Sequence, residues 1–461
     1  MRLGKLSFGS KIKSKLHFEF SRESLTSYAG LEVIREYLLE TGFVRRLKNS
    51  DAEQRWKGDF RFSSAVLLLL SAILVGARRL RHLEYLQHDP MILRAANISQ
   101  MPTTRTVARS LAKVRMLELV DLAELSRSVV VEGLSHHNLP RITLDIDGSV
   151  ITTGQKVEGA ARGYNPHNRK NPSYYPIGIM IAQTGHVWSQ ENRPGNIHDA
   201  NDADATIRKA VAQLNDEMNF KGVVELRADS AFFSEGFLEA CDSTDVEYAI
   251  KVPMWPWLNI KSLVKKCTKW TSIDSKGNVQ GTFTSLLVNQ WGRTEAIAIY
   301  RTKRSNRPTK GVQLDLFNPD DGFWEYSVVA TNKTLGLKAL HAFSNGRGAQ
   351  EKTIGELKTG FAYDSVVSKK EGANAAWQKL AILAHNISVS LQLRHGAQRK
   401  ARSAKRTTAF FIQRIATLRF EWLNRAGRIL RPQGKLTIRL ADNDNVREHY
   451  EKFGLAEERA A

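Results

Sequence analysis

The stretch Arg141–Gly148, RITLDIDG, decides the class of fold. Apolar and polar residues alternate from Ile142 to Asp147, which is the period of a strand with one face in a core. Residues two apart on a strand share a face, so periodicity leaves open whether Asp145 or Asp147 serves at a site. Gly148 favours Asp147, because backbone can approach a ligand closely at a glycine.

Strands and helices alternate after this strand. Residues 174–182 and 186–190 predict a hairpin, 202–218 a helix, 223–228 a buried strand and 248–252 a short strand. This alternation predicts a mixed α/β sheet covered by helices. The strand 223–228 ends at Asp229, and carboxylates at the carboxyl ends of neighbouring strands lie where α/β folds place their sites. For Asp147 or Asp229 alone, a turn former or helix N-cap is the ordinary structural explanation.

The 461 residues exceed what one hydrophobic core usually serves, so several units are expected. We expect an N-terminal helical DNA-binding region over 1–138, the first part of an α/β core over 139–252, an all-β insertion over 253–334, the second part of the core over 335–395 and a basic C-terminal region over 396–461. The insertion is suggested by short strands, turn residues and five of the nine tryptophans.

Charge is the outlying property of the composition. Lys and Arg number 68 against 47 Asp and Glu, a formal net charge of +21, so a polyanionic partner is expected, nucleic acid before membrane. The segment 394–439 holds thirteen basic residues and one acid.

Three further features bear on the cellular setting. Cys241 and Cys267 show no spacing typical of a disulfide framework or a zinc site. The longest apolar run, 65–77, is too short to span a bilayer and predicts a buried helix. The first residues carry no secretory signal, so we expect a cytoplasmic protein with no membrane partner.

A basic amphipathic helix is expected from residue 103 or 104. Thr103 or Thr104 is a suitable N-cap, and the helix carries Arg105, Arg109 and Lys113. Such a helix suits the recognition helix of a helix-turn-helix motif. An ordinary helix with a solvated basic face is the alternative, and the pattern does not choose between them.

The segment 344–358, SNGRGAQEKTIGELK, predicts a helix capped by Ser344 or Asn345. At about 100° per residue, Arg347, Glu351 and Lys358 fall on one face. An exposed Arg–Glu pair is the structural alternative for this helix taken alone.

These motifs together resemble the DDE transposases of bacterial insertion sequences, and most closely the 1380 group, which is related to transposases with a Y-R-E-K third motif. The resemblance rests on LDIDGSV, RADSAFF and the spacing R-x3-E-x6-K, with a tryptophan-rich insertion before the third motif. Stretches 65–90, 102–111, 163–166, 193–196 and 374–393 fit the same group.

The resemblance implies a ribonuclease-H-like core in which Asp147, Asp229 and Glu351 hold two Mg²⁺ ions, with Mn²⁺ as a substitute. It implies that Arg347 and Lys358 grip phosphates near the cut. Ser344 stands where related transposases have Tyr; a serine can bond a phosphate oxygen but cannot stack on a base.

Aromatic and basic residues elsewhere are further candidates for DNA contact. Trp255, Trp257 and Trp291 could stack on an extruded base, although filling a small β core is the commoner role for such residues. The loop 161–173 carries Arg162 and Tyr164, for which substrate contact and a plain solvated turn are both open.

The function expected from the resemblance is that of a DNA transposase. It would bind the terminal inverted repeats of its element, free a 3′-hydroxyl at each end and join those ends to target DNA, acting as a homodimer on DNA at the bacterial nucleoid. Two rivals stay open: a catalytically inactive transposase-derived DNA-binding regulator, and a ribonuclease-H-fold nuclease without strand transfer.

Overall fold

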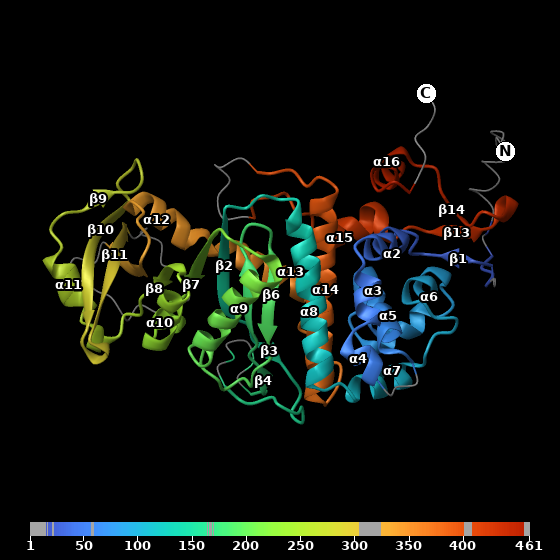
Figure 1. Cartoon of the computed structure of the whole chain (residues 1–461), viewed down its shortest axis with the longest axis horizontal. Coiled ribbons are helices and arrows are strands. Elements are labelled where there is room, and N and C mark those ends of the chain that lie inside the picture. Colours follow the sequence, from blue (N-terminus) through green and yellow to red (C-terminus); the bar gives the residue numbers. More distant parts are fainter. Residues whose placement is uncertain are drawn as a thin grey trace.

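One sheet of nine strands runs through the molecule. The computed structural model describes residues 15, 17–20, 23–56, 60–163, 165, 168, 170–303, 324–400 and 408–455. The strand order is β6-β5-β2-β7-β8-β12-β11-β10-β9, with the inner strands at the centre of the elongated molecule (Figure 1). We call the five strands from β6 to β8 in this order the inner sheet. They are β2 (Arg141–Gly148), β5 (Ile177–Ile181), β6 (His186–Glu191), β7 (Val223–Ala228) and β8 (Glu247–Lys251). β2, β5 and β6 are antiparallel neighbours, whereas β2, β7 and β8 are parallel. The expected mixed α/β class is confirmed.

The segment 253–334 is β-rich, but it is not a separate all-β module. It contributes β9 (Thr271–Ser272), β10 (Val279–Val288), β11 (Arg293–Lys303), β12 (Trp324–Thr331) and also one helix, α11 (Ile260–Lys266). β12 pairs antiparallel with β8 through Ala330 and Ile250, so these strands continue the inner sheet. The physical reason is that β8 would otherwise leave an unpaired edge of backbone donors and acceptors.

Helices cover both faces of the inner sheet. On one face, Ile142, Leu144 and Ile146 share a core with α9 (Ala203–Met218) and α10 (Glu235–Ser243). On the other face, Met180 and Val187 pack with α13 (Gly348–Gly360) and α14 (Glu371–Arg394). α14 lies against α8 (Met116–Ser135) over much of its length. The polar side of β2 therefore faces α13, the helix of the third motif.

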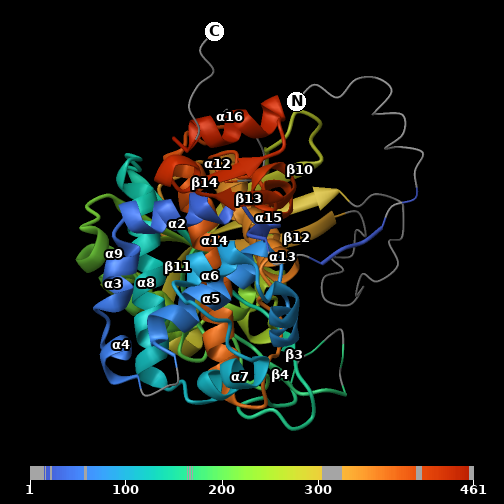
Figure 2. The same ribbon diagram turned by 90° about the vertical axis from the view of Figure 1, so that its right-hand side faces the viewer.

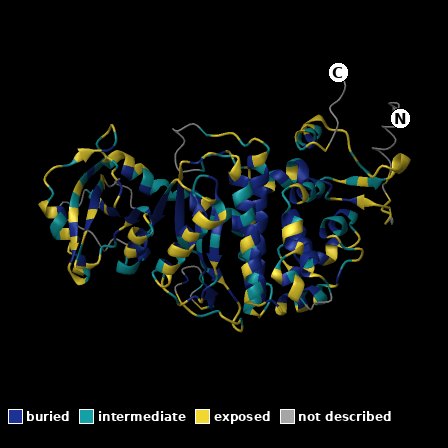
Figure 3. Ribbon diagram, viewed as in Figure 1, coloured by how far each residue is buried: buried dark blue, intermediate teal, exposed yellow. Residues whose placement is uncertain are grey.

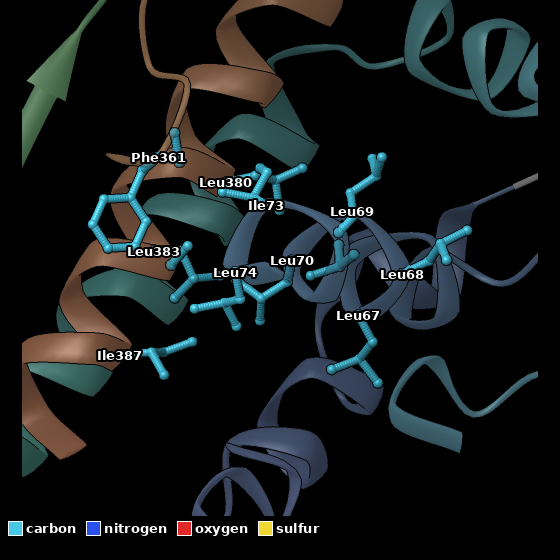
Figure 4. Packing of buried hydrophobic residues seen from close by; sticks show 14 of the residues in the cluster. Leu67, Leu68, Leu69, Leu70, Ile73, Leu74, Phe361, Leu380, Leu383 and Ile387 are labelled. Carbon is cyan, nitrogen blue, oxygen red and sulfur yellow. The ribbon is translucent and has the colours of Figure 1, made fainter. Parts of the chain in front are cut away.

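Short helices precede the sheet: α2 (Leu31–Glu40), α3 (Phe43–Lys48), α4 (Asp51–Arg55), α5 (Phe62–Val75), α6 (Pro90–Ala96) and α7 (Thr104–Ala112). α5 contains most of the apolar run and is buried at every residue except Ala65, as expected. Figure 4 shows Ile73 and Leu74 of α5 directed towards Leu380 and Leu383 of α14. Among the described residues, no single helix meets the length and hydropathy of a membrane span; α5 and the turn Leu80–Leu86 do so only together, bent by 84°.

The C-terminal residues fold back onto the N-terminal helices and are not a separate unit. β13 (Gly427–Leu430) pairs with β14 (Thr437–Leu440) and with β1 (Leu25–Thr26), and α16 (Asp444–Lys452) follows. Figure 2 shows β13, β14 and α16 above α2. Trp422 and Leu423 lie in the same core as α2 and α5, because residues of this size need burial. The buried core of α5 and α14 therefore extends to Trp422 and Leu423, whereas β13 and β14 hold no buried residue (Figure 3).

Candidate active site

Two aspartates meet at the carboxyl ends of neighbouring parallel strands. β2 and β7 pair in register through Asp145 and Arg227, so Asp147 and Asp229 stand two residues further along. Asp147 Oδ1 accepts from the Gly148 amide at 3.0 Å. Asp229 Oδ1 accepts from the Ala231 amide at 2.9 Å and caps the turn Ser230–Phe232. Each aspartate thus forms its local turn and still presents its second oxygen to the site.

Asp145 has a different environment from Asp147. Its side chain is only 1% exposed, and both oxygens bind Arg227, at 2.6 and 2.7 Å. A carboxylate held in this way has no oxygen to spare for a ligand. The ambiguity between Asp145 and Asp147 is thereby resolved, and Asp147 is the carboxylate that faces the site.

Arg347 joins the two aspartates. Its Nη2 lies 3.2 Å from Asp147 Oδ2, and its Nη1 lies 3.9 Å from Asp229 Oδ2. Nη2 also donates to the Ile146 carbonyl at 3.3 Å. Nε is buried without a hydrogen-bond partner among the described atoms. The site therefore has one cationic fork between two carboxylates.

The Asp147 carboxyl has a strongly shifted pKa. Its pKa is raised to about 7: burial is the main cause, Arg347 opposes it, and the negative charges of Asp229 and Asp199 add to the rise. A group whose charged form is this disfavoured gains from any additional positive charge nearby.

Asp199 belongs to this cluster and was not expected from the sequence. Its Oδ2 accepts from the Tyr175 hydroxyl at 2.8 Å, whereas Oδ1 is buried with no hydrogen-bond partner among the described residues. Burial raises the pKa of Asp199, and the charge of Asp229 adds to that effect. A Cβ at Gly148 would lie 2.4 Å from the Tyr175 ring and 2.5 Å from Asp199, which explains a glycine beside Asp147. The neighbouring RPGN stretch was the only signal for this region, and it carries no acid.

The third predicted acid stands apart from this cluster. Glu351 lies in the first turn of α13 and is exposed. Lys358, further along α13, donates to the Val150 carbonyl at 3.1 Å, and burial lowers its pKa. Arg347 and Lys358 both reach the β2 side. Glu351, which the spacing placed on the same face, is exposed, because Arg347 belongs to the turn before α13 and not to the helix itself.

The donor set nevertheless fits a hard divalent cation. Among the described residues, no three acidic, histidine or cysteine side chains already converge to hold an ion. The available donors are all oxygens, which such cations prefer. Asp199 Oδ1 has no hydrogen-bond partner among the described residues, although Arg193 Nη2 lies 3.7 Å from it. The negative charge of Asp229 disfavours the charged form of Asp147, and the positive charge of Arg347 opposes that effect.

The predicted helix over 344–358 is interrupted. α12 (Leu337–Ser344) ends at Ser344, a tight turn covers Asn345–Arg347, and α13 begins at Gly348. Neither Ser344 nor Asn345 caps α13; the Ser344 hydroxyl and the Asn345 amide both bond back to the His341 carbonyl. Ser344 is buried, so the expected contact between its hydroxyl and a phosphate is not supported.

The three candidate tryptophans form one aromatic group. Trp255 and Trp257 stack with ring centroids 5.4 Å apart, and Trp257 meets Trp291 edge-on at 5.9 Å. Trp291 in turn packs at 5.2 Å on Phe233, four residues after Asp229. Trp255 and Trp257 are 37% and 40% exposed, so they do not simply fill a core.

The remaining candidates lie on the surface. Arg162 is exposed and donates to Gln155, while Tyr164 lies outside the described residues. Arg105, Arg109 and Lys113 are all exposed on the side of α7 opposite Val107 and Leu111, and Thr103 caps the helix as expected. Both interpretations of α7 fit this arrangement.

Comparison with known proteins identifies the class. The family model "Transposase DDE domain group 1" matches residues 8–456. The chain belongs to this family of transposases. A search of curated protein sequences finds no significant match.

Solved structures with similarity include a cryo-EM piggyBac transposase synaptic complex with hairpin DNA, at 8% identity and a TM-score of 0.37, covering 78% of this chain and 75% of that one. A Mos1 transposase paired-end complex with a left transposon end shows 9% identity and a TM-score of 0.18, with 53% and 64% covered. A Mos1 mariner paired-end complex with Mn shows 11% identity and a TM-score of 0.18, with 52% and 80% covered.

Proposed function

We propose that this transposase cuts the ends of a bacterial insertion sequence of the 1380 group and joins them to target DNA. The observation that carries the proposal is the pairing of Asp147 and Asp229 at adjacent strand ends with Arg347 between them. The strand order, an antiparallel hairpin beside three parallel strands, supports a ribonuclease-H-like core.

Asp147, Asp229 and Glu351 are the residues that we assign to two Mg²⁺ ions, with Mn²⁺ able to replace them. Bound there, the ions would supply a nucleophile from water or a 3′-hydroxyl and stabilise the leaving oxygen. Glu351 lies on the first turn of α13, one helical turn after Arg347, whose guanidinium contacts both aspartates.

The basic side chains position the DNA backbone in this proposal. Arg347 offers a planar fork suited to two phosphate oxygens, and Lys358 offers a point charge on the same side of α13. Burial lowers the pKa of Lys358, and the negative charge of an incoming phosphate would oppose that shift.

Residues outside the acidic cluster are assigned to further contacts with the DNA. The aromatic group of Trp255, Trp257 and Trp291 is assigned to an unstacked base. The exposed rings are those of Trp255 and Trp257, and the packing of Trp291 on Phe233 places the group near Asp229. The basic face of α7 and the loop containing Arg162 and Tyr164 are assigned to duplex DNA. Two ends must meet, so a homodimer on DNA is expected, at the nucleoid of a bacterial cytoplasm.

The test is incubation with a labelled inverted-repeat end, a target duplex and Mg²⁺. Strand-transfer products are expected. Cleavage without joining would indicate a nuclease, and a shifted but intact duplex would indicate a non-catalytic regulator. Either of the last two outcomes would overturn the proposed transposition activity.

A further inference from the structure

The buried ion pair of Asp145 and Arg227 lies directly behind the candidate active site. The two residues are direct partners on β2 and β7, two positions before Asp147 and Asp229. Their side chains are 1% and 8% exposed, and two hydrogen bonds of 2.6 and 2.7 Å join them. The guanidinium is consequently fixed in orientation as well as in place.

The free end of this guanidinium reaches the third motif. Arg227 Nη1 donates to the Phe343 carbonyl at 3.1 Å, in the last turn of α12. The Phe343 ring also lies over the guanidinium, 5.4 Å from its carbon to the ring centroid. One side chain therefore joins β2, β7 and the end of α12.

Gly346 fits directly onto the same nitrogen. A Cβ at Gly346 would lie 1.9 Å from Arg227 Nη1. A free arginine would swing aside, but Asp145 holds this one by both oxygens. The turn Asn345–Arg347 is therefore shaped to the ion pair.

The start of α13 is attached to β2 at neighbouring points. Gln350 Nε2 donates to the Asp145 carbonyl, and Arg347 Nη2 donates to the Ile146 carbonyl, both at 3.3 Å. The contact of Arg347 with Asp147 thus follows from where the turn sits.

Stability alone is a poor explanation for such a pair. Desolvating two charges usually offsets most of their attraction, so apolar residues of similar size serve a core as well. An apolar pair, however, could not donate to the Phe343 carbonyl or accommodate Gly346 in the same way.

We propose that Asp145 and Arg227 are positioning residues that set the place of Arg347 and α13 relative to Asp147 and Asp229. The effect on catalysis rests on the function proposed above; the effect on the turn does not.

The experiment compares Arg227→Lys with Arg141→Lys in the full chain. Arg141 forms ion pairs with Glu225 and Glu247 at the other end of the same strands, so it controls for loss of a guanidinium. Two readouts are taken: amide hydrogen exchange resolved by peptide, and the single-turnover cleavage rate together with the dissociation constant for an inverted-repeat end.

For Arg227→Lys we expect faster exchange confined to residues 343–358. We also expect a cleavage rate lower by about 10- to 100-fold, the size of effect that a displacement near 1 Å produces, with DNA affinity within about twofold of wild type. Arg141→Lys should change neither readout.

Gly346→Ala keeps both charges and provides an independent variant should Arg227→Lys fail to fold. It should show the same local exchange and the same loss of rate. In Arg227→Lys the shorter side chain leaves room for a Cβ at residue 346. The cleavage rate of the double variant, Arg227→Lys with Gly346→Ala, should therefore be no lower than that of the slower single variant.

Unchanged exchange over 343–358 in both variants, or exchange that rises equally in every peptide, would overturn the proposal. A wild-type protein that does not cleave would refute the proposed function instead, and the exchange data would still decide whether the pair positions the turn.

Discussion

At the residue scale, Asp147 and Asp145 show how two identical side chains on one strand face come to differ. Asp145 meets an arginine on the adjacent strand and is neutralised by it. Asp147 meets a second carboxylate, and Arg347, the cation paired with it, is shared with Asp229. The sequence pattern could not separate them, because the partner that distinguishes them lies 82 residues away on β7.

The raised pKa of Asp147 predicts a pH effect on stability without metal. The folded protein binds a proton up to about pH 7, whereas the unfolded chain releases it near the ordinary pKa of 3.8. Stability should therefore fall as pH rises from about 4 to 7, by at most about 4 kcal/mol from this group.

The measurement is the free energy of unfolding of wild type and Asp147→Asn at pH 5 and pH 8, in chelator. The free energy of unfolding of the variant, relative to that of wild type, should be larger at pH 8 than at pH 5. A difference between the two proteins that is the same at both pH values would contradict the assigned pKa.

At the element scale, α13 is held at both ends. Its first turn is attached to β2 by the hydrogen bonds of the Arg347 and Gln350 side chains. At its last residue, the Gly360 carbonyl accepts from Arg419 Nη2 at 2.8 Å. The same guanidinium binds the Ile73 and Leu74 carbonyls, so it caps the carboxyl end of α5 as well.

Arg419→Met should therefore destabilise the protein by roughly 2–4 kcal/mol, because three carbonyl oxygens in partly buried hydrogen bonds lose a charged donor. Burial lowers the pKa of Arg419 to about 10, consistent with its enclosed position. Denaturant unfolding is the measurement, with Arg414→Met, whose side chain is 78% exposed, as the matched control. An equally small loss of unfolding free energy in both variants would rule out this capping role.

The basic face of α7 gives a prediction about DNA. Replacing Arg105, Arg109 and Lys113 by alanine should weaken binding to an inverted-repeat end. The slope of log affinity against log salt should become shallower by roughly 0.9 for each phosphate that these side chains neutralise. The control replaces Lys261, Lys265 and Lys266 of α11, at the other end of the molecule. An unchanged slope would favour an ordinary solvated helix.

The elements that the sequence predicted well are those with strong periodicity. α5, the hairpin β5–β6, α9 and β7 lie where apolar spacing placed them. The break at Asn345–Arg347 was not visible, because it depends on Arg227 across the site. Asp199 was missed because its role arises from distant neighbours, Tyr175 and Gly148, and not from local pattern.

At the scale of the whole molecule, the surplus of positive charge is only partly a free surface. The segment 394–439 holds much of this surplus, yet Arg419 is enclosed and Arg394 pairs with Glu40 and Glu132. Apolar residues interspersed with these bases, such as Trp422, determine the fold of the segment. Net charge predicted the kind of partner but not which charges face it.

Ending the chain at residue 400 should consequently damage the N-terminal helices, not merely DNA affinity. The loss of β13, Trp422 and Leu423 would expose one side of α2 and α5. Thermal unfolding followed by circular dichroism should show a clearly lower midpoint, while a chain ending at residue 455 should match the full length. A truncated protein with an unchanged midpoint would show that the two ends do not share a core.

The most direct test of the proposed function asks which acids carry the reaction. Strand transfer from a labelled inverted-repeat end with Mg²⁺ is measured for Asp147→Asn, Asp229→Asn, Glu351→Gln and Glu356→Gln, together with DNA binding. Glu356 lies on the same helix but accepts from the Ile415 amide at 2.8 Å, a bond that glutamine can keep. We expect no products from the first three variants, normal DNA binding by all four and transfer by Glu356→Gln. Normal transfer by Glu351→Gln with none by Glu356→Gln would contradict the assignment of the third acid.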